Sequence, residues 1–357
     1  MKKLLSIFAV LLSTILISCN RSPEDIEATI KSGVVLVQNL SYYEVVLPNG
    51  NSMYFSGFDE EGDISGLENE EDSVEVSISY GTGFFISNDG EIVTNAHVVT
   101  NTKDEKEVSK SFEAIVDGLK SIVVSEYKEK SEQLSELNNL VEYAYYSSDV
   151  SVEEYNNVKA VRDALVEEMT EFANAYEALD KIRAKDLEIK YHNAVSIAYN
   201  DTHVTDIEDF EKCVVKAIDQ DHDLAILQLN NKETPSNKYV FPIAEEDPLE
   251  SYSLMDKITK TTSDDKNSTL YMMGFNLGPS LAITEEGILA QFNNGSISQK
   301  TKDRLMYSIP TLPGSSGSPV VNSKGELVAI NYAGLDKTQS FNYGIRVKHL
   351  KNLLQKK

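Results

Sequence analysis

Residues 312–321 read Leu-Pro-Gly-Ser-Ser-Gly-Ser-Pro-Val-Val, and this stretch decides how the rest of the chain is interpreted. A serine hydroxyl is a weak nucleophile at neutral pH. It needs a base for its proton and N–H donors for the oxyanion that forms. Ser316 is the candidate nucleophile, and the backbone amides of Gly314, Ser315 and Ser316 are the candidate oxyanion hole. Glycine and serine clusters are also typical of simple turns, so the interpretation requires partners elsewhere in the chain.

Two upstream stretches supply such partners. Residues 81–99 read Gly-Thr-Gly-Phe-Phe-Ile-Ser-Asn-Asp-Gly-Glu-Ile-Val-Thr-Asn-Ala-His-Val-Val, which predicts two strands around an Asn-Asp-Gly turn, with His97 at the end of the second strand. Residues 221–229 read Asp-His-Asp-Leu-Ala-Ile-Leu-Gln-Leu, and Asp223 directly precedes the apolar run. We expect His97 to act as the general base and Asp223 to orient its imidazole, with Asp221 as the nearest substitute.

The three motifs follow one another in the order His97, Asp223, Ser316, within the segments TNAHVV, DHDLAILQL and GSSGSPVVNSKGELVAI. In these segments the chain resembles the trypsin-like serine peptidases of the chymotrypsin fold, and most of all their disulfide-free bacterial HtrA-type and V8-type branch. The resemblance covers the protease domain, with no PDZ-like extension. It implies a mostly β fold of two six-stranded antiparallel β-barrels. It also implies hydrolysis of peptide bonds through an acyl-enzyme, with no cofactor and no metal.

The order of the motifs disfavours an α/β-hydrolase. That fold places its nucleophile in Gly-x-Ser-x-Gly on a strand–turn–helix, and its histidine follows the serine. Here Ser318 stands two residues after Ser316, and Pro319 and a β-rich run follow where a helix is required. The only later histidine, His349, lies in a lysine-rich terminal segment.

The same resemblance implies where the primary specificity pocket lies. Pro310 stands where a trypsin-like enzyme has its carboxylate, which disfavours Arg or Lys in the substrate. V8-type enzymes have a histidine at Asn331, so a preference for glutamate is also disfavoured, and a small or neutral side chain is expected. The residues implied to line the pocket are Thr311, Asn331, Tyr332, Ala333 and Gly344.

The first residues are typical of an export signal. Lys2 and Lys3 precede an apolar run over residues 4–17 that is too short to span a membrane comfortably. Leu-Ile-Ser-Cys at residues 16–19 resembles a bacterial lipobox, which implies cleavage before Cys19 and a lipid on its thiol. The alternative is an ordinary secretory peptide in which Cys19 is incidental. The lipidated form would be anchored in the bacterial cell envelope, on the periplasmic face or the cell surface.

Charge and cysteine content restrict the partners. The 357-residue chain has a formal net charge of −24, which disfavours nucleic acid and anionic lipid as partners. A neutral or basic polypeptide fits this charge best. With Cys19 lipidated, Cys213 is the second and last cysteine, so an intramolecular disulfide is excluded, and its strand-like surroundings predict a buried structural thiol.

Between the His and Asp motifs the pattern becomes helical. Residues 102–186 are rich in Glu, Lys, Ala and Leu, and their apolar residues recur at helical spacing. They predict an antiparallel helical hairpin with a turn at residues 147–151, preceded by a shorter helix over residues 107–120. Ser151 and Glu154 form a capping box for the second helix of the hairpin. This insert is either an inert decoration, a partner-docking arm or a lid over the cleft.

Several β elements are predicted around these motifs. Strands are expected over residues 33–38, 187–191, 194–199, 213–218 and 287–292, and a hairpin over residues 42–47 and 52–55. Residues 58–72 form an acidic loop, for which a calcium site is a weaker alternative because the spacing does not match an EF-hand. A short helix is expected over residues 349–357.

These observations divide the chain and lead to one main hypothesis. The function is that of an exported, lipid-anchored serine endopeptidase acting on polypeptides. The alternative is a non-catalytic surface lipoprotein whose helical insert binds a partner while the barrels serve as scaffold. The predicted segments are a signal peptide (1–18), a tether (19–32), the first barrel in two parts (33–101 and 187–234), the helical insert (102–186), the second barrel (235–348) and a terminal helix (349–357). Within the tether, residues 23–32 are either extended or a short helix.

Overall fold

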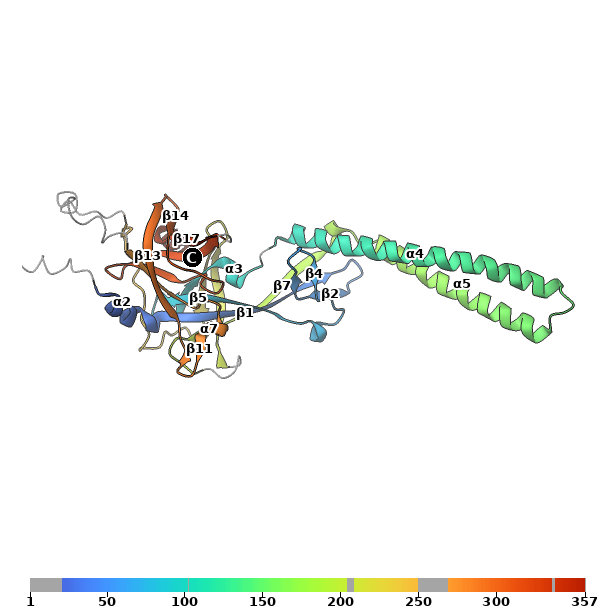
Figure 1. Ribbon diagram of the computed structural model, residues 1–357, viewed down its shortest axis with the longest axis horizontal. Coiled ribbons are helices and arrows are strands. Elements are labelled where there is room, and N and C mark those ends of the chain that lie inside the picture. Colours follow the sequence, from blue (N-terminus) through green and yellow to red (C-terminus); the bar gives the residue numbers. More distant parts are fainter. Residues whose placement is uncertain (1–20, 102, 204–208, 250–268, 336–337, 357) are drawn as a thin grey trace, which may run out of the picture. The chain divides into compact units, whose positions relative to one another are not determined.

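The structure is a computed structural model that describes residues 21–101, 103–203, 209–249, 269–335 and 338–356 (Figure 1). The chain forms two compact units. Unit 1 comprises Met1–Ser41, Ile78–Thr100 and Asn193–Lys357, and unit 2 comprises Tyr42–Ser77 and Asn101–His192. None of the described helices is long and apolar enough to cross a membrane.

The first barrel contains six strands in the order β1-β5-β6-β9-β8-β7 and is closed by pairing of β1 with β7. Alternate residues of β1 enter different cores, because Val34 and Leu36 pack in one apolar cluster while Val35 and Val37 pack in another. This explains why the start of β1 is apolar at consecutive positions. The strands are β1 (Val34–Val46), β5 (Ser77–Phe85), β6 (Glu91–Thr94), β7 (Glu188–Tyr199), β8 (Glu211–Asp219) and β9 (Leu224–Leu229).

The second barrel is also closed and six-stranded, in the order β10-β13-β14-β17-β16-β15. The prediction of two antiparallel six-stranded barrels is therefore confirmed. The strands are β10 (Thr269–Gly274), β13 (Gln291–Lys300), β14 (Arg304–Tyr307), β15 (Pro319–Asn322), β16 (Leu327–Leu335) and β17 (Thr338–Arg346). The strand expected over residues 287–292 is instead divided between β12 (Gly287–Ile288), which pairs with β11 (Ile283–Thr284), and the start of β13.

Short helices complete unit 1. They are α2 (Pro23–Ile30), followed by a 3-10 turn at Lys31–Gly33, and then α3 (Ala96–Val99), α7 (Pro279–Ala282) and α8 (Val347–Lys356). Ser22 accepts a hydrogen bond from the Asp25 amide at the start of α2, and Ile26 and Ile30 of this helix are fully buried. Residues 23–30 therefore form a helix and not an extended tether.

Unit 2 is built on a small β platform that carries the helical hairpin. The end of β1 pairs with β2 (Ser52–Phe55) across a turn at residues 47–51, as predicted, and β3 (Gly57–Phe58) pairs with β4 (Ile64–Ser65). Short 3-10 helices at Glu71–Ser73 and Ala184–Asp186 flank these elements. The aromatic rings of Tyr43 and Phe55 stack with 4.7 Å between their centroids and lie in the buried core of the unit.

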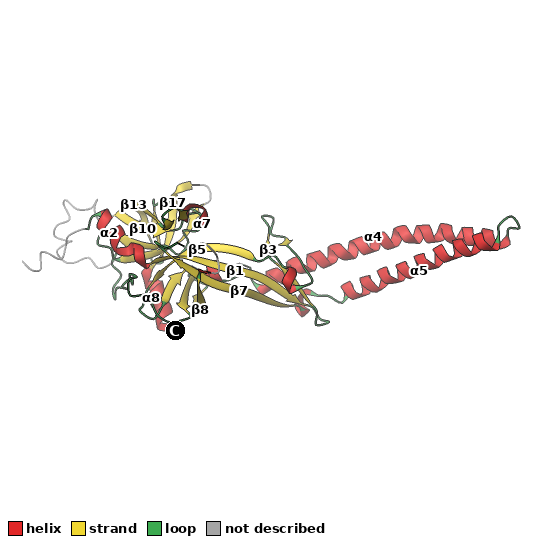
Figure 2. Ribbon diagram, turned by 90° about the horizontal axis from the view of Figure 1, so that it is seen from below, coloured by secondary structure: helices red, strands yellow, loops and turns green. Residues whose placement is uncertain are grey.

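The hairpin consists of α4 (Glu105–Tyr146) and α5 (Val152–Asp180), which lie side by side and run antiparallel (Figure 2). α4 is one helix of 42 residues, so the expected separate helix over residues 107–120 is wrong. The following residues contain no proline, and Ser121 donates its hydroxyl to the Asp117 carbonyl within the helix. The capping box of Ser151 and Glu154 is present at the start of α5, as predicted.

Candidate active site

His97 lies on α3, directly after β6, and it is held by Asp223. Its ring Nδ1 lies 2.7 Å from Asp223 Oδ2, and its backbone N–H donates to Asp223 Oδ1 at 2.9 Å. A carboxylate only accepts hydrogen bonds, so Nδ1 carries the proton and Nε2 is left as the free lone pair of the neutral ring. With 41% of its side chain exposed, His97 is accessible from solvent.

The position of Asp223 is fixed by an unusual backbone conformation at the start of β9. Its φ of +51° lies in the left-handed region, which is uncommon for a non-glycine residue. Its amide donates to the Gln220 carbonyl at 3.3 Å, and its own carbonyl accepts from Asn95 Nδ2 at 2.8 Å. Of the two aspartates considered from the sequence, the structure brings Asp223 to His97.

Ser316 lies on a tight turn that contains two glycines with positive φ, Gly314 at +94° and Gly317 at +88°. The Ser315 amide donates to the Leu312 carbonyl at 3.0 Å, and the Gly317 amide donates to the Asn331 carbonyl at 2.8 Å. Within the described residues, the amides of Gly314 and Ser316 have no acceptor. Ser315, one of the three predicted donors, therefore has its amide engaged in the turn, while the other two remain available.

Thr82 on β5 holds this turn from the first barrel. Its amide donates to the Ser316 carbonyl at 2.7 Å, and its hydroxyl donates to the Gly314 carbonyl at 2.8 Å. Thr82 Oγ1 also accepts from the Phe275 amide, and the Thr82 carbonyl accepts from Thr94. The sequence interpretation did not identify Thr82. The signal in the sequence is a single polar residue between two glycines, followed by two phenylalanines. In the structure all residues of β5 from Gly81 onward are buried, including Thr82.

Asn331 on β16 holds the same turn from the second barrel. Its amide donates to the Ser318 carbonyl at 2.9 Å, its carbonyl accepts from Gly317, and its Nδ2 donates to the Ser315 carbonyl at 2.9 Å. Its Oδ1 accepts from the Tyr307 hydroxyl at 2.7 Å. Asn331 is only 1% exposed and its polar atoms are engaged, so it positions the turn in this structure in addition to bordering the expected pocket.

Gly81 shows how close Ser316 lies to the residue that follows His97. A Cβ on Gly81 would lie 2.7 Å from both Cγ atoms of Val98 and 3.3 Å from the Ser316 carbonyl oxygen. His97 and Ser316 therefore lie on two segments that meet at one glycine of β5. Over the described part of the chain, Ser316 Oγ makes no hydrogen bond with His97, whose partner is Asp223.

The other residues predicted for the specificity pocket lie on β16, β17 and the segment before the turn. Thr311 and Tyr332 are half-buried, Gly344 is buried, and Ala333 pairs with Tyr343 in the β16–β17 register. The space beside Gly344 is occupied by Tyr307, because a Cβ on Gly344 would lie 3.0 Å from its ring. Tyr307 is fully buried, and this burial raises the pKa of its hydroxyl well above the ordinary value.

A hollow of about 370 Å³ beside Asp223 is lined by acidic, basic and aromatic side chains. At this hollow the ring of His222 stacks on His349 of α8, with 3.8 Å between centroids. His349 is 5% exposed, although it lies in the lysine-rich terminal segment. The lining residues are Asp221, His222, Asp223, Thr301, Asp303, Arg304, Tyr332 and Ile345.

The sequence predicts a lipidation site at Cys19 and a buried structural thiol at Cys213. Cys19, the expected lipidation site, lies outside the described residues. Cys213 is a free, half-buried thiol on β8, and burial raises its pKa to about 12. The thiol is therefore protonated at neutral pH and is not a nucleophile.

Comparison with known proteins gives one family match. The family model described as a trypsin-like peptidase domain matches residues 183–330, a span that contains Asp223 and Ser316 and begins after His97. No curated protein matches the chain in sequence. The crystal structure of the serine endoprotease from Yersinia pestis is similar with 12% identity and a TM-score of 0.44, covering 95% of this chain and 67% of that one. Residues 183–330 are therefore similar to a trypsin-like peptidase domain, and the described part of the chain forms two closed, six-stranded antiparallel barrels.

Proposed function

We propose that this protein is a serine endopeptidase in which His97, Asp223 and Ser316 form the catalytic triad. The observation that carries the proposal is the two-point hold of Asp223 on His97, through the ring Nδ1 at 2.7 Å and the backbone amide at 2.9 Å. This hold leaves Nε2 as the base. The two amides without acceptors, on Gly314 and Ser316, flank the hydroxyl that this base would serve.

In the proposed reaction, His97 Nε2 takes the proton of Ser316 Oγ as the oxygen attacks the carbonyl carbon of the scissile peptide bond. Asp223 stabilises the imidazolium that forms and keeps the ring in the required tautomer. The amides of Gly314 and Ser316 donate to the oxyanion of the tetrahedral intermediate. His97 then protonates the leaving amine, which leaves an acyl group on Ser316. In the second half of the reaction His97 takes a proton from water, the water attacks the acyl carbon, and His97 returns the proton to Ser316 Oγ.

The substrate that we propose is a polypeptide with a small or neutral side chain before the cleaved bond. Tyr307 supports this proposal, since its buried ring occupies the space beside Gly344 and its hydroxyl is bonded to Asn331. A long side chain would have to displace that ring. The exposed Pro310 also brings no carboxylate to this region for Arg or Lys. Cleavage of a peptide library by the purified protein, read by mass spectrometry, would reveal this preference.

The proposed activity is tested with a fluorophosphonate probe, which labels an activated serine covalently. The full chain should be labelled, and Ser316→Ala and His97→Ala should each lose the label. Ser148→Ala serves as a control and should keep the label, because Ser148 is an exposed serine in the turn of the helical hairpin. A well-folded parent that takes no label, or a Ser316→Ala variant that still does, would overturn the proposal.

We further propose that the protein is held in the cell envelope by a lipid on Cys19. The support is the sequence pattern of two lysines, a short apolar run and Leu-Ile-Ser-Cys. A lipid anchor binds one leaflet without spanning the membrane. Detergent phase partition of the expressed protein and of Cys19→Ala tests this proposal: the parent should enter the detergent phase and the variant should remain in the aqueous phase.

A further inference from the structure

The α4–α5 hairpin has an anchored base and an exposed remainder. At the base, Val108, Phe112 and Val116 of α4 are at most 3% exposed and pack with Tyr43 and other residues of the β platform. Farther along, many apolar side chains remain in water. The most exposed are Ile122 at 59%, Val124 at 53%, Leu140 at 53%, Tyr143 at 62%, Tyr145 at 67%, Tyr146 at 78%, Val152 at 77% and Val161 at 57%.

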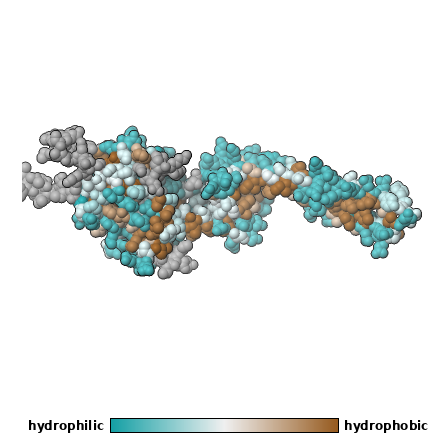
Figure 3. All heavy atoms as spheres, viewed as in Figure 1, coloured by the Kyte–Doolittle hydropathy of each residue, from teal (hydrophilic) through white to brown (hydrophobic). Residues whose placement is uncertain are grey.

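This exposure follows from having only two helices. Two helices bury one seam, so each keeps part of its apolar stripe uncovered unless a further helix packs on it. In the described part of the hairpin beyond the base, only Ala144, Leu165 and Met169 are buried apolar residues. Figure 3 shows hydrophobic atoms gathered along this element on the face in view. Apolar patches of this kind mark interaction sites.

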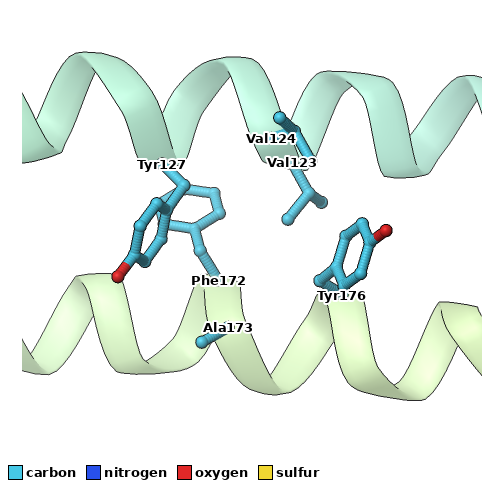
Figure 4. A pocket seen from close by; sticks show the side chains of 6 residues that line it. All are labelled: Val123, Val124, Tyr127, Phe172, Ala173 and Tyr176. Carbon is cyan, nitrogen blue, oxygen red and sulfur yellow. The ribbon is translucent and has the colours of Figure 1, made fainter.

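A hollow of about 250 Å³ lies between the two helices (Figure 4). Six apolar or aromatic residues line it, and both tyrosine hydroxyls point away from it. An engineered apolar cavity of about 150 Å³ takes up benzene, so this hollow has room for a large aliphatic or aromatic side chain. The lining residues are Val123, Val124 and Tyr127 of α4 and Phe172, Ala173 and Tyr176 of α5.

The hollow lies between two ion pairs along the hairpin. Lys120 pairs with Asp180 at 3.3 Å before the lining residues of α4, and Lys130 pairs with Glu168 at 2.7 Å after them. The two helices together contain 17 acidic and seven basic residues. Lys120 and Lys130 are paired, whereas exposed Lys128, next to Tyr127, has no ion pair among the described residues, so the surface around the hollow keeps a surplus of carboxylates. Among the described residues, exposed Glu126 and Glu171, which adjoin two of the lining aromatics, form no ion pair.

This charge distinguishes the possible occupants. A second copy of the hairpin would bring an equally acidic surface to the hollow, and like charges at close range oppose association. A lysine- or arginine-bearing helix would pair with the surplus carboxylates while its apolar face covers the exposed stripe. We propose that the α4–α5 hairpin binds a basic amphipathic helix of another polypeptide, with one large apolar side chain seated in the hollow.

The test uses the full chain with Ser316→Ala, so that the peptide is not consumed. The probe is a synthetic 21-residue helix with leucines at i, i+3, i+4 and i+7, lysines elsewhere and one central tryptophan. The protein contains no tryptophan, so all tryptophan emission comes from the peptide. Binding should shift this emission to shorter wavelength, and a matched peptide with glutamate in place of lysine should bind at least tenfold more weakly.

Two alanines of α5 provide a matched pair of variants. Ala173→Leu fills the hollow from its own wall, whereas Ala175→Leu adds the same side chain two residues away on the same helix, outside the lining. Both alanines are exposed and leucine is a good helix former, so both variants keep the fold. We expect Ala173→Leu to weaken binding at least tenfold and to abolish the emission shift, while Ala175→Leu leaves both unchanged.

Three outcomes would overturn the inference. They are equal binding of the lysine and glutamate peptides, equal affinity in the two leucine variants, and self-association of the chain that excludes the peptide in sedimentation experiments. The inference is independent of the proposed peptidase. Ala173→Leu placed in the chain with Ser316 intact should take the fluorophosphonate label at the parent rate, so a failure of either proposal can be recognised separately.

Discussion

At the residue scale, the site depends on which polar groups each side chain leaves available. Both carboxylate oxygens of Asp223 accept hydrogen bonds from His97. Thr82 donates to the carbonyls of Gly314 and Ser316. Asn331 donates to the carbonyls of Ser315 and Ser318. The segment around Ser316 is thus held on its carbonyl side, while two of its amides stay free for an oxyanion. This asymmetry is what an oxyanion hole requires, since the donors must be fixed before charge develops.

The substitution Asp223→Asn tests the hold on His97. An amide can donate to the ring and so favours the wrong tautomer, which lowers the rate of a serine peptidase by about 10⁴. We expect fluorophosphonate labelling to slow by about 10³ to 10⁴ while the circular dichroism spectrum is unchanged. Asp221→Asn, two residues earlier and exposed, is the matched control and should keep the parent rate.

The substitution Asn331→Ala tests the hold on the turn. It leaves the Tyr307 hydroxyl without this partner, and a buried group without a partner costs roughly 1–3 kcal/mol. It also removes one donor to the Ser315 carbonyl, which keeps Ser318 as a partner. We expect labelling of Ser316 to slow at least tenfold, together with a lower melting temperature. Asn342→Ala removes another buried amide, one that donates to the Ile309 carbonyl, and should lower the melting temperature with a smaller effect on labelling. Equal labelling losses in the two variants would contradict a specific positioning role.

At the element scale, the chemistry-bearing motifs were predictable because each lies at the end of an element with a clear local pattern. The strand–turn–strand before His97, the strand after Asp223 and the turn at Ser316 all have the expected form. The extents of elements were less predictable. β1 and β7 are each one long strand where two were expected, because pairing partners continue past the polar residues that interrupt the pattern.

The hydrogen-bond network of the turn could not be derived from local pattern. Thr82 and Gly314 are 232 residues apart in the sequence. A hydrogen bond between such distant residues produces no periodic pattern in the sequence, so it could not be predicted. The same holds for His349, whose lysine-rich neighbours suggest a surface helix. In the structure α8 turns this residue inward against His222. Long-range pairing, not propensity, determined both features.

α8 provides a pH-dependent prediction. Burial, followed by His222 and Lys348, lowers the pKa of His349 below its ordinary value of about 6.5, while Asp303 acts in the opposite direction. The unfolded chain therefore binds a proton at His349 at a pH where the folded chain does not. The contribution of neutral His349 to the free energy of unfolding is present above about pH 6.5 and is lost as pH falls toward the lower folded pKa. Urea unfolding at pH 7.5 and 5.5 should show a smaller loss for His349→Phe than for the parent. The same pH slope in both proteins would be inconsistent with this role of α8.

The start of α5 provides a prediction for the hairpin. Ser151 accepts from the Glu154 amide at 3.2 Å, and Glu154 accepts from the Ser151 amide at 2.8 Å. Replacing such a cap by alanine costs about 1 kcal/mol of helix stability. Ser151→Ala should therefore speed hydrogen exchange in the first turns of α5, as seen by mass spectrometry, while Ser148→Ala in the same turn should not. Equal exchange in both variants would argue against the cap.

At the scale of the whole molecule, and under the proposed function, the net charge of −24 shapes encounters with substrates. A field of one sign attracts oppositely charged partners and is screened by salt. We expect the kcat/KM for a lysine-bearing peptide to exceed that for a glutamate-bearing peptide with the same cleavable residues at low ionic strength. The two values should converge as sodium chloride is raised to about 0.5 M. A gap that is independent of salt would assign the preference to contacts in the site instead.

The hold of Thr82 on the turn of Ser316 has a consequence for the timing of activity. The first barrel is complete in sequence at Leu229, well before the ribosome reaches the segment that carries Ser316 and its second holder, Asn331. A nascent or truncated chain that ends before Gly314 can thus contain the hydrogen bonds between His97 and Asp223 and still lack both amides that would donate to the oxyanion. Under the proposed function, synthesis itself keeps the enzyme latent until the second barrel closes on the first.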